Sequence, residues 1–348
     1  MANKAEFLNQ HPKSFFLDAE DLNGLAAYLR QQKWLGESET LLGARKAGEG
    51  NMNYTLRVTT SRRTLIVKQA RPWVEKYPQI AAPRQRAVVE GSFYQQVSQH
   101  PAVAEMMPGL IGFDATSCTI ALEDLGEASD FTSLYRGEVL PESALDQLAD
   151  YLSHLHQIAS GELGEVFANR AMRELNHQHI FDLPLRQAEL LDLDAITPGL
   201  RQAAQTLKDD RHYVEMAAKL GQLYLADNSA GVLLHGDFFP GSWLKTAAGA
   251  RVIDPEFCFV GAAEFDLGVM LAHLHLANQP ASLPASLDDR LLSRYQTPTG
   301  FDQSLMRQFA GIEIMRRLIG VAQLPPSYDL DRKAELLALS RQLVLERS

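Results

Sequence analysis

The pattern of apolar residues changes about a third of the way along this chain, and the change restricts the folds that it can adopt. Three early segments, LLGARKAG, NYTLRVTT and RRTLIVKQA, alternate apolar and polar residues or are rich in β-branched ones, with turn-forming residues between them. Later, the apolar residues of ESALDQLADYLSHLHQIA recur every three or four positions, as on the buried face of a helix. We therefore expect an α+β, bilobal chain, with a small β-rich lobe over residues 1–123 and a larger, mostly helical lobe over 124–348.

The same patterns predict the remaining elements. Further strands are expected at 110–115 and 118–123, and short ones at VLLH and RVID. Helices are expected at 82–98, 142–159, 200–225, 262–276, 286–296, 302–322 and 330–346.

Composition narrows the class of protein. The 348 residues include 33 basic and 43 acidic side chains, and the net charge of −10 argues against a nucleic-acid-binding or polybasic membrane-binding surface. The only two cysteines, Cys118 and Cys258, predict a reducing compartment and no disulfide framework. Because the N-terminus has no apolar signal segment and no apolar run approaches membrane-spanning length, we expect a cytoplasmic protein.

Residues 47–58, AGEGNMNYTLRV, place Gly48, Gly50 and Asn51 between two expected strands. A glycine-rich hairpin can lay its backbone N–H groups over phosphate groups. Gly-Asn turns also simply close hairpins, and this segment taken alone favours that second interpretation.

Lys68 lies in the strand segment LIVKQA, where its neighbours alternate between apolar and polar. An inward-pointing lysine needs an anion, and Glu90 in the following helical segment is the best candidate for an ion pair that orients Lys68 towards a phosphate. The alternative is a solvated lysine on an edge strand, with Glu90 paired to Arg86 one helical turn away. The two interpretations are evenly balanced.

Two acidic motifs follow short strands in the second half of the chain. HGDFFPGS contains Asp237, placed to accept a proton from a hydroxyl group, and DPEF contains Asp254 and Glu256, a pair suited to an oxygen-coordinated cation such as Mg²⁺. Alone, the first motif could be a helix cap and the second a turn. Their order, their spacing and their apolar flanks favour the functional interpretation, and Asp266 adds a further acid in the same apolar region.

Arg316 and Arg317 lie in a segment whose apolar residues predict a buried helical face that includes Arg316. A guanidinium in an apolar stripe needs an acceptor, either an internal carboxylate or a ligand. Arg317 follows Glu313 by one turn and can simply form a helix ion pair. The sequence alone leaves the role of Arg316 open between these alternatives.

Three pairs of histidines, each two residues apart, invite a metal-site interpretation. The pairs are His154 and His156, His177 and His179, and His273 and His275. Residues two apart on a helix point about 200° away from each other, so the first and third pairs are expected to be core or capping histidines.

In their order along the chain, these motifs resemble the protein-kinase-like small-molecule phosphotransferases, a group that includes aminoglycoside phosphotransferases, choline kinases and 5-methylthioribose kinases. The resemblance covers residues 45–322 and is strongest to the methylthioribose kinases, through GEGNMNY, VKQA, RAVVE, LEDL, HGDFFPGS, VIDPEF, EFDLG and EIMRRLIG. It implies a protein-kinase-like fold and transfer of the γ-phosphoryl group of ATP to a small-molecule hydroxyl. Methylthioribose or a related sugar is the favoured acceptor.

The resemblance also implies a role for each matching residue. Asp237 would be the catalytic base, Asp254 and Glu256 would bind Mg²⁺, and Arg316 and Arg317 would hold the sugar. The residues that would bind the nucleotide are Gly48, Gly50, Asn51, Lys68, Glu90, Glu123, Leu125 and Ser242. Ser242 occupies the position at which methylthioribose kinases carry serine and most other relatives carry asparagine.

This sequence departs from the methylthioribose kinases in two places. They usually carry a histidine near the position of Phe239, and residues 71–85 follow their lid-like segment only loosely. Another metabolite or an aminoglycoside therefore stays open as the acceptor. A non-catalytic nucleotide-binding pseudokinase is the alternative from another class, and a homodimer is implied only by analogy.

Overall fold

The computed structural model describes residues 2–48, 52–158, 160–188, 191–227, 231–279, 286–324 and 328–346. The chain divides into two compact units between Ala128 and Ser129, whereas the sequence pattern places the change between residues 123 and 124. In the described residues, no helix is both long and apolar enough to span a lipid bilayer.

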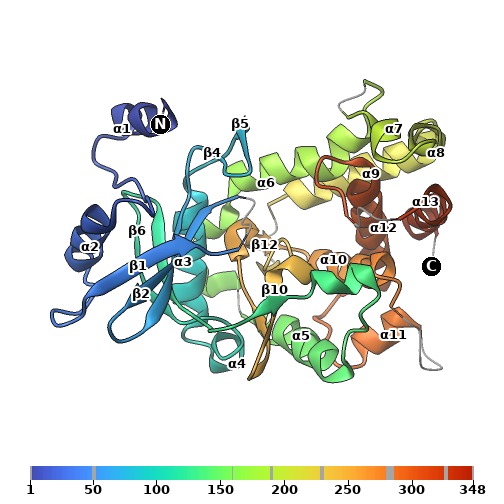
Figure 1. Cartoon of the computed structure of the whole chain (residues 1–348). Helices are drawn as coiled ribbons and strands as arrows, with labels where there is room; N and C mark the ends of the chain where they lie inside the picture. Colours follow the sequence, from blue (N-terminus) through green and yellow to red (C-terminus); the bar gives the residue numbers. More distant parts are fainter. Residues whose placement is uncertain are drawn as a thin grey trace. The chain divides into compact units, whose positions relative to one another are not determined.

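The first unit is built on an antiparallel sheet of five strands in the order β1-β2-β3-β7-β6 (Figure 1). The strands are β1 (Leu41–Lys46), β2 (Tyr54–Thr60), β3 (Thr64–Gln69), β6 (Leu110–Asp114) and β7 (Thr119–Glu123). The helices are α1 (Ala2–Gln10), α2 (Leu22–Gln31), α3 (Arg86–Val97) and α4 (Pro101–Ala104). All five strands were predicted from the sequence, whereas α1 and α2 were not.

Strand β3 is the middle strand of this sheet and pairs with both β2 and β7. Leu65 and Val67 are completely buried against apolar residues of α2, including Leu25 and Leu29. Because successive side chains on a strand point to opposite faces, Lys68 faces the other side, where α3 lies (Figure 1). The alternation along LIVKQA therefore places this lysine on the α3 face of the sheet.

A short hairpin of β4 (Trp73–Val74) and β5 (Tyr77–Ala81) precedes α3. The fully buried guanidinium of Arg86 donates hydrogen bonds to the carbonyl oxygens of Arg71, Pro83 and Met52, at 2.9, 2.8 and 3.0 Å. It also donates to Asn53 Oδ1 at 2.9 Å. One side chain in the first turn of α3 thus ties both ends of segment 71–85 to the start of β2.

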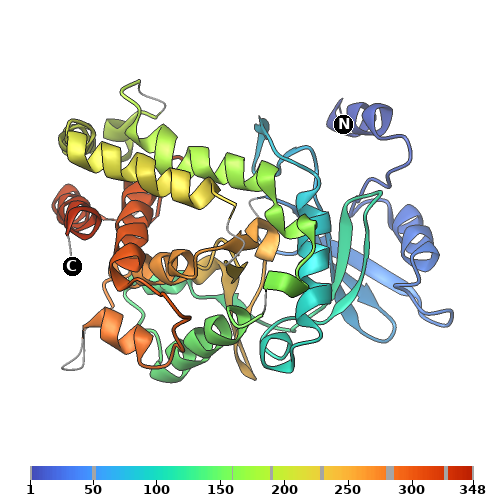
Figure 2. The same cartoon turned by 180° about the vertical axis from the view of Figure 1, so that it is seen from behind.

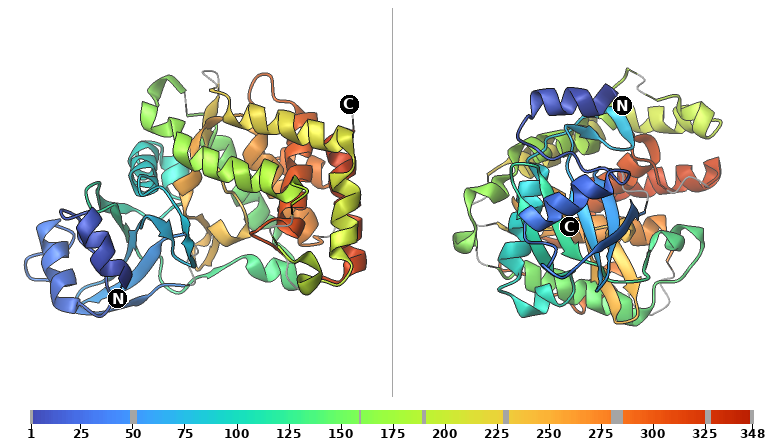
Figure 3. Two further views of the ribbon diagram at one scale, coloured as in Figure 1. Left: turned by 90° about the horizontal axis from the view of Figure 1, so that it is seen from above. Right: turned by 60° about the vertical axis from the view of Figure 1, so that its left-hand side comes forward.

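The second unit is mostly helical, as predicted. Its helices are α5 (Glu142–Leu155), α6 (Arg170–His177), α7 (Leu193–Ile196), α8 (Leu200–Lys208), α9 (Arg211–Leu225), α10 (Glu264–Leu276), α11 (Leu287–Leu292), α12 (Gln303–Ile319) and α13 (Leu330–Leu345). Helices α6 and α9 run side by side (Figure 3). Helix α12 lies across α10 and is covered in turn by α13 (Figure 2).

The single helix expected over 200–225 is two helices in the structure. The first ends at Lys208, and Asp210 caps the second, because its carboxylate accepts hydrogen bonds from the backbone N–H groups of His212 and Tyr213. An aspartate that caps a new helix satisfies donors that would otherwise lack partners. The prediction of one continuous helix was wrong for this reason.

Helices α10 and α12 approach each other closely at Gly268. A Cβ atom at this position would lie 2.7 Å from the carbonyl oxygen of Met306, so a larger residue would push the two helices apart. Of the residues of α10, all but His275 are buried, which is the signature of a helix enclosed by the core. Any polar residue on α10 must therefore find its partner inside the protein.

Short strands carry the two acidic motifs of this unit. Strand β9 (Val232–Leu234) pairs with β12 (Phe259–Gly261), and β10 (Trp243–Thr246) pairs with both β11 (Gly249–Val252) and β8 (Ser129–Asp130). The HGD motif follows β9, and the DPE motif lies between β11 and β12. The two motifs therefore leave short strands of the same unit.

The buried Lys333 on α13 gives a prediction about stability. Its ammonium donates to the hydroxyl oxygen of Thr197 at 2.7 Å, it is only 1% exposed, and burial lowers its pKa. Because the charged form is disfavoured in the fold, we expect Lys333→Met to raise the free energy of unfolding by about 1 kcal/mol. Urea denaturation at pH 7 measures this, with the exposed Lys219→Met as the control that should give no gain. Loss of stability in Lys333→Met would contradict the argument.

Candidate active site

Lys68 and Glu90 form a buried ion pair in the first unit. Lys68 Nζ lies 2.6 Å from Glu90 Oε1, and the two residues are 5% and 0% exposed. The pair joins the central strand β3 to α3, on which Glu90 follows Arg86 by one helical turn. Burying two charges is tolerated only when each is compensated, so Glu90 fixes the position of the Lys68 ammonium. The alternative of a solvated lysine with an Arg86–Glu90 pair is wrong.

Of the other predicted nucleotide-binding residues of the first unit, Gly48, Glu123 and Leu125 lie at or just after the ends of strands. Gly48 has a φ of +64°, a backbone conformation that favours glycine. Gly50 and Asn51 lie outside the described residues. Glu123 ends β7 with an exposed side chain, its backbone N–H donates to the carbonyl of Gly109 at 2.8 Å, and Leu125 follows it half-buried.

The backbone of the HGD motif is held by a buried carboxylate on α10. Asp266 is completely buried and accepts hydrogen bonds from the N–H groups of His235, at 2.6 Å, and Gly236, at 2.9 Å. His156 Nε2 lies 3.2 Å from the same carboxylate and its Nδ1 lies 2.7 Å from the Tyr295 hydroxyl. Asp266, the buried acid whose role the sequence left unexplained, therefore fixes the turn that carries Asp237.

The HGD and DPE motifs lie against each other. His235 Nε2 lies 2.9 Å from the carbonyl oxygen of Ile253, the residue before Asp254. Gly236 has a φ of +84°, and a Cβ atom there would lie 2.1 Å from the carbonyl oxygen of Phe257. Only glycine fits this approach, which brings the loop of Asp237 beside the turn that contains Asp254 and Glu256.

The two phenylalanines of HGDFFPGS have different environments. Phe238 is completely buried and stacks on Tyr151 of α5, with ring centroids 5.7 Å apart. Phe239 is half-buried, and its ring lies 4.6 Å from the Arg317 guanidinium. The first ring anchors the loop in the core, and the second covers one face of a cation.

The DPE turn offers two carboxylates in a constrained backbone. Asp254 adopts the left-handed conformation, with a φ of +64°, and Glu256 is 6% exposed. Asn169 Nδ2 holds the turn by donating to the carbonyls of Glu256 and Cys258, at 3.1 and 2.9 Å. Strained conformations of non-glycine residues often mark functional sites, and carboxylate oxygens suit a hard cation such as Mg²⁺.

The residues present fit Mg²⁺ that is shared with phosphate groups better than a cation held by protein alone. Among the described residues, no group of three or more acidic, histidine or cysteine side chains is assembled around a possible metal position. Mg²⁺ commonly takes one or two carboxylates and completes its shell with phosphate oxygens and water. Ser242 is buried, and its hydroxyl donates to the carbonyl oxygen of Asp237 at 3.1 Å.

Arg316 and Arg317 surround the carboxylate of Asp237. Each places an Nη2 atom 3.3 Å from Asp237 Oδ1, and the Asp237 side chain is 23% exposed whereas both arginines are nearly buried. Arg316 Nε also pairs with Glu313 Oε2, and Arg317 Nε donates to Glu313 Oε1 at 2.8 Å. The alternatives from the sequence were an internal carboxylate or a ligand, and in the structure both arginines bond to two internal carboxylates.

A histidine and a tyrosine complete this cluster behind Glu313. His273 Nε2 lies 3.0 Å from Glu313 Oε1, and its Nδ1 lies 2.7 Å from the Tyr135 hydroxyl. Burial lowers the pKa of His273 to about 4 and raises the pKa of Tyr135, whereas Arg316 and Arg317 outweigh burial and hold the pKa of Glu313 well below its usual range. Neutral His273 thus donates from Nε2 to the carboxylate and accepts from Tyr135 at Nδ1.

The local sequence pattern around Asp266, Glu313 and His273 does not show that the three residues hold one site together. Asp266 and His273 are seven residues apart, which on a helix is about two turns and the same face. Two polar residues on one face of the apolar segment EFDLGVMLAHLHL were the signal of buried hydrogen-bonded partners. The interpretation of His156 and His273 as core histidines agrees with their burial.

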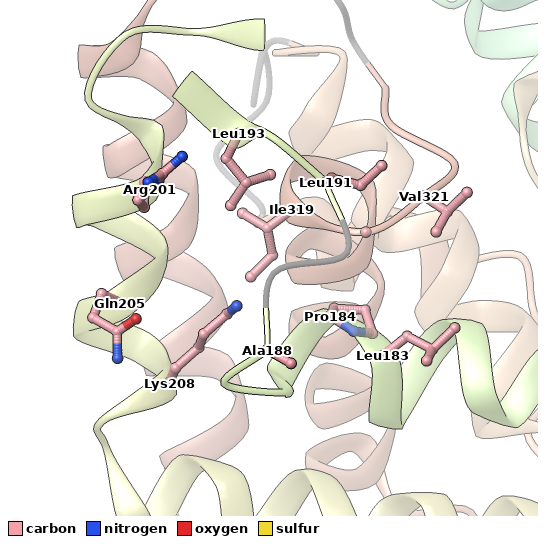
Figure 4. A pocket seen from close by; sticks show the side chains of 11 residues that line it. Leu183, Pro184, Ala188, Leu191, Leu193, Arg201, Gln205, Lys208, Ile319 and Val321 are labelled. Carbon is pink, nitrogen blue, oxygen red and sulfur yellow. The ribbon is translucent and has the colours of Figure 1, made fainter. Parts of the chain in front are cut away.

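A separate small pocket is lined by both apolar and polar side chains, the polar ones being Arg201, Gln205 and Lys208 (Figure 4). It is lined by residues such as Leu183, Pro184, Leu193 and Ile319, and no predicted site residue lines it. Its volume of about 20 Å³ is close to that needed for one water molecule. The cluster around Asp237, which joins a partly exposed carboxylate to two fixed guanidinium groups, is the stronger candidate for binding an oxygen-rich molecule and accepting its proton.

The burial of Asp266 predicts a large effect of a small substitution. We expect Asp266→Asn to lower the free energy of unfolding by about 3 kcal/mol. The amide of asparagine has only one oxygen, so its NH₂ group would face one of the two backbone N–H groups that donate to the carboxylate. Urea denaturation measures the loss. The control is Asp146→Asn, which removes a partly exposed pair with Arg290 and should cost less than about 1 kcal/mol. Equal losses in the two variants would refute the anchoring role.

The pKa of His273 predicts how stability depends on pH. Its folded pKa of about 4 lies below the unfolded value of 6.5, so the unfolded chain takes up a proton that the folded one does not. Stability contributed by neutral His273 is present above pH 6.5 and is lost as the pH falls towards 4, by up to about 3 kcal/mol. We expect His273→Gln to flatten this decline in urea denaturation between pH 7 and 4.5. An unchanged slope would contradict the assignment.

Comparison with known proteins identifies the family. A family model described as the phosphotransferase enzyme family matches residues 43–308. Methylthioribose kinase of Geobacillus thermodenitrificans is 28% identical over 363 residues, covering 89% of this chain and 88% of the relative. Methylthioribose kinase of Exiguobacterium sibiricum is 26% identical over 354 residues, covering 88% of each.

Solved structures agree on the fold. Spectinomycin phosphotransferase in complex with ADP and spectinomycin has a TM-score of 0.51 at 12% identity, covering 93% of this chain and 97% of its own. A choline/ethanolamine kinase family protein from Mesorhizobium loti has a TM-score of 0.50 at 14% identity, covering 94% of each chain. The predicted α+β class and the resemblance to small-molecule phosphotransferases are confirmed. The chain belongs to the phosphotransferase enzyme family and is an ATP-dependent kinase of small molecules.

Proposed function

We propose that this kinase transfers the γ-phosphoryl group of ATP to a hydroxyl of methylthioribose or a related sugar, at the anomeric position. The observation that carries the proposal is the arrangement of Arg316 and Arg317, whose Nη2 atoms both lie 3.3 Å from Asp237 Oδ1. A sugar is rich in hydroxyl oxygens, which accept hydrogen bonds from fixed guanidinium groups. The similarity over most of the chain to proteins named methylthioribose kinase supports the choice of acceptor.

Asp237 is the proposed base. The acceptor hydroxyl loses its proton to Asp237 as its oxygen forms a bond to the γ-phosphorus. The bond from that phosphorus to the β–γ bridging oxygen breaks, and ADP leaves. Asp266 contributes by holding the backbone N–H groups of His235 and Gly236, just before the base, and the two arginines contribute by orienting the acceptor against the base. Catalysis of this kind depends mostly on positioning.

The nucleotide is proposed to be bound by residues of the first unit. Lys68, held by Glu90, would neutralise charge on the phosphates, and Gly48, Gly50 and Asn51 would direct backbone N–H groups towards them. The backbone at Glu123 and Leu125 would bind the adenine ring. These roles come from the resemblance of the motifs, and the buried Lys68–Glu90 pair supports them.

Mg²⁺ is proposed to bind at the DPE turn. Asp254 and Glu256 would hold it, since their carboxylates lie on one constrained turn beside the HGD loop. The ion would supply charge neutralisation on the phosphate oxygens. The Ser242 hydroxyl is bonded to the Asp237 carbonyl, so we assign it to shaping the loop near the nucleotide rather than to the metal.

We also propose a cytoplasmic location and a homodimer. The location is supported by the two cysteines, which are both buried and are not joined by a disulfide, as expected in a reducing compartment. The dimer rests on analogy with the methylthioribose kinases alone. Light scattering of the purified chain distinguishes monomer from dimer.

An acceptor panel tests the proposed reaction. The protein is incubated with Mg-ATP and methylthioribose, other sugars, amino alcohols or aminoglycosides, and ADP release is measured. We expect the largest kcat/KM with methylthioribose or a related sugar, and we expect Asp237→Ala to lower kcat by about a thousandfold. ATP binding by the variant, measured by calorimetry, controls for an intact nucleotide site.

Each other outcome has a definite meaning. Preference for an aminoglycoside or amino alcohol over every sugar would overturn the acceptor but keep the phosphotransferase. ATP binding without turnover of any acceptor that depends on Asp237 would instead support the pseudokinase alternative.

A further inference from the structure

Glu313 holds two arginines that a helix would otherwise direct apart. Arg316 and Arg317 are consecutive residues of α12, and consecutive side chains on a helix point about 100° from each other. Glu313 precedes them by three and four residues, so it lies one turn away on the face between them. Its Oε2 pairs with Arg316 Nε and its Oε1 accepts from Arg317 Nε, and this bridge brings both guanidinium groups to the same acid, Asp237.

The division of hydrogen bonds between the two carboxylates is unequal. Arg317 Nε lies 2.8 Å from Glu313, whereas both Nη2 atoms are 3.3 Å from Asp237. Charge-assisted bonds of this type are usually 2.7–2.9 Å long, so the bonds to Asp237 are the weaker ones. Glu313 therefore bonds the Nε atom of each arginine closely, and Asp237 is left with the longer and weaker bonds from the Nη2 atoms.

Glu313 is itself fixed from behind. It is 1% exposed, and His273 of α10 lies 3.0 Å from its Oε1. His273 is in turn held by Tyr135, at 2.7 Å, and Phe239 covers the face of Arg317. Glu313 and Asp237 carry two negative charges and the arginines two positive ones, so the cluster is balanced. Without the Glu313 charge, two adjacent guanidinium groups would share a single acid, Asp237.

We propose that Glu313 is a positioning residue for the acceptor: it holds Arg316 and Arg317 in the orientation that binds acceptor hydroxyls while keeping both arginines from pairing closely with the base. This inference rests on the proposed function, because it assigns Asp237 as base and the arginines as acceptor ligands. Glu313 touches neither reactant in this scheme and acts through the arginines.

Glu313→Gln in the full-length protein tests the inference, because the amide keeps the size of the side chain but loses the charge and one acceptor. We expect the acceptor KM to rise about tenfold or more, with the ATP KM within about twofold of wild type. Steady-state kinetics with the best acceptor from the panel, varying each substrate in turn, measure the two values. Asp288→Asn is the matched control, since it removes another buried carboxylate of the same unit, paired with Arg307, and should leave the acceptor KM unchanged.

The split between KM and kcat separates positioning from folding. If Glu313 serves only the fold, Glu313→Gln lowers the fraction of active protein, so the apparent kcat falls while both KM values stay at wild type. That result, with wild-type turnover intact, overturns the inference and leaves the proposed function standing. Absence of Asp237-dependent turnover in the wild-type protein overturns the proposed function, and the inference with it.

Discussion

The carboxylate of Asp266 is the fixed point on which the candidate active site depends. It is completely buried, and its oxygens accept from the backbone N–H groups of His235 and Gly236. A buried carboxylate is tolerated only where donors surround it, and here the donors belong to the loop that must be held still. Because Gly236 also lies against the carbonyl of Phe257, the same interaction sets the HGD loop beside the DPE turn.

Helix α10 connects this fixed point to the second group of charges. Asp266 near its start holds the loop of Asp237, and His273 two turns later bonds to Glu313. Burying a cluster of charges costs a large desolvation free energy, which the attraction between its carboxylates and guanidinium groups only partly offsets. Here the cluster consists of Glu313, Arg316, Arg317 and Asp237. An apolar cluster of the same size would stabilise the fold at least as well. What an apolar cluster would lack is hydrogen-bond donors at fixed positions around a partly exposed acid.

Local periodicity predicted the elements far better than their contacts. The five strands of the first unit follow from alternation in segments such as LIVKQA, where each residue already shows which face it occupies. The break at Asp210 was missed because the apolar spacing continues across it and only the capping geometry ends the helix. The Asp266–Gly236 bond joins positions thirty residues apart, and no local pattern reports it. Motif order suggested that Lys68 and Glu90 pair, but whether Arg316 faces a carboxylate or a ligand depended on the orientation of α12.

The chain is acidic overall, and carboxylates hold the cations of its candidate site. With a net charge of −10, the protein as a whole repels anions, so attraction must be local. The structure keeps its relevant cations buried and paired: Lys68 with Glu90, and the two arginines with Glu313 and Asp237. A buried cation lies in a low dielectric, where its electrostatic interaction with an anion is stronger than in water. Pairing with a carboxylate also keeps the cation from moving. Phe239 covers the flat face of Arg317, so hydrogen bonding at the edge of that guanidinium is favoured. If Arg316 and Arg317 bind the acceptor as proposed, its selection rests on the placement of its hydroxyl oxygens more than on its net charge.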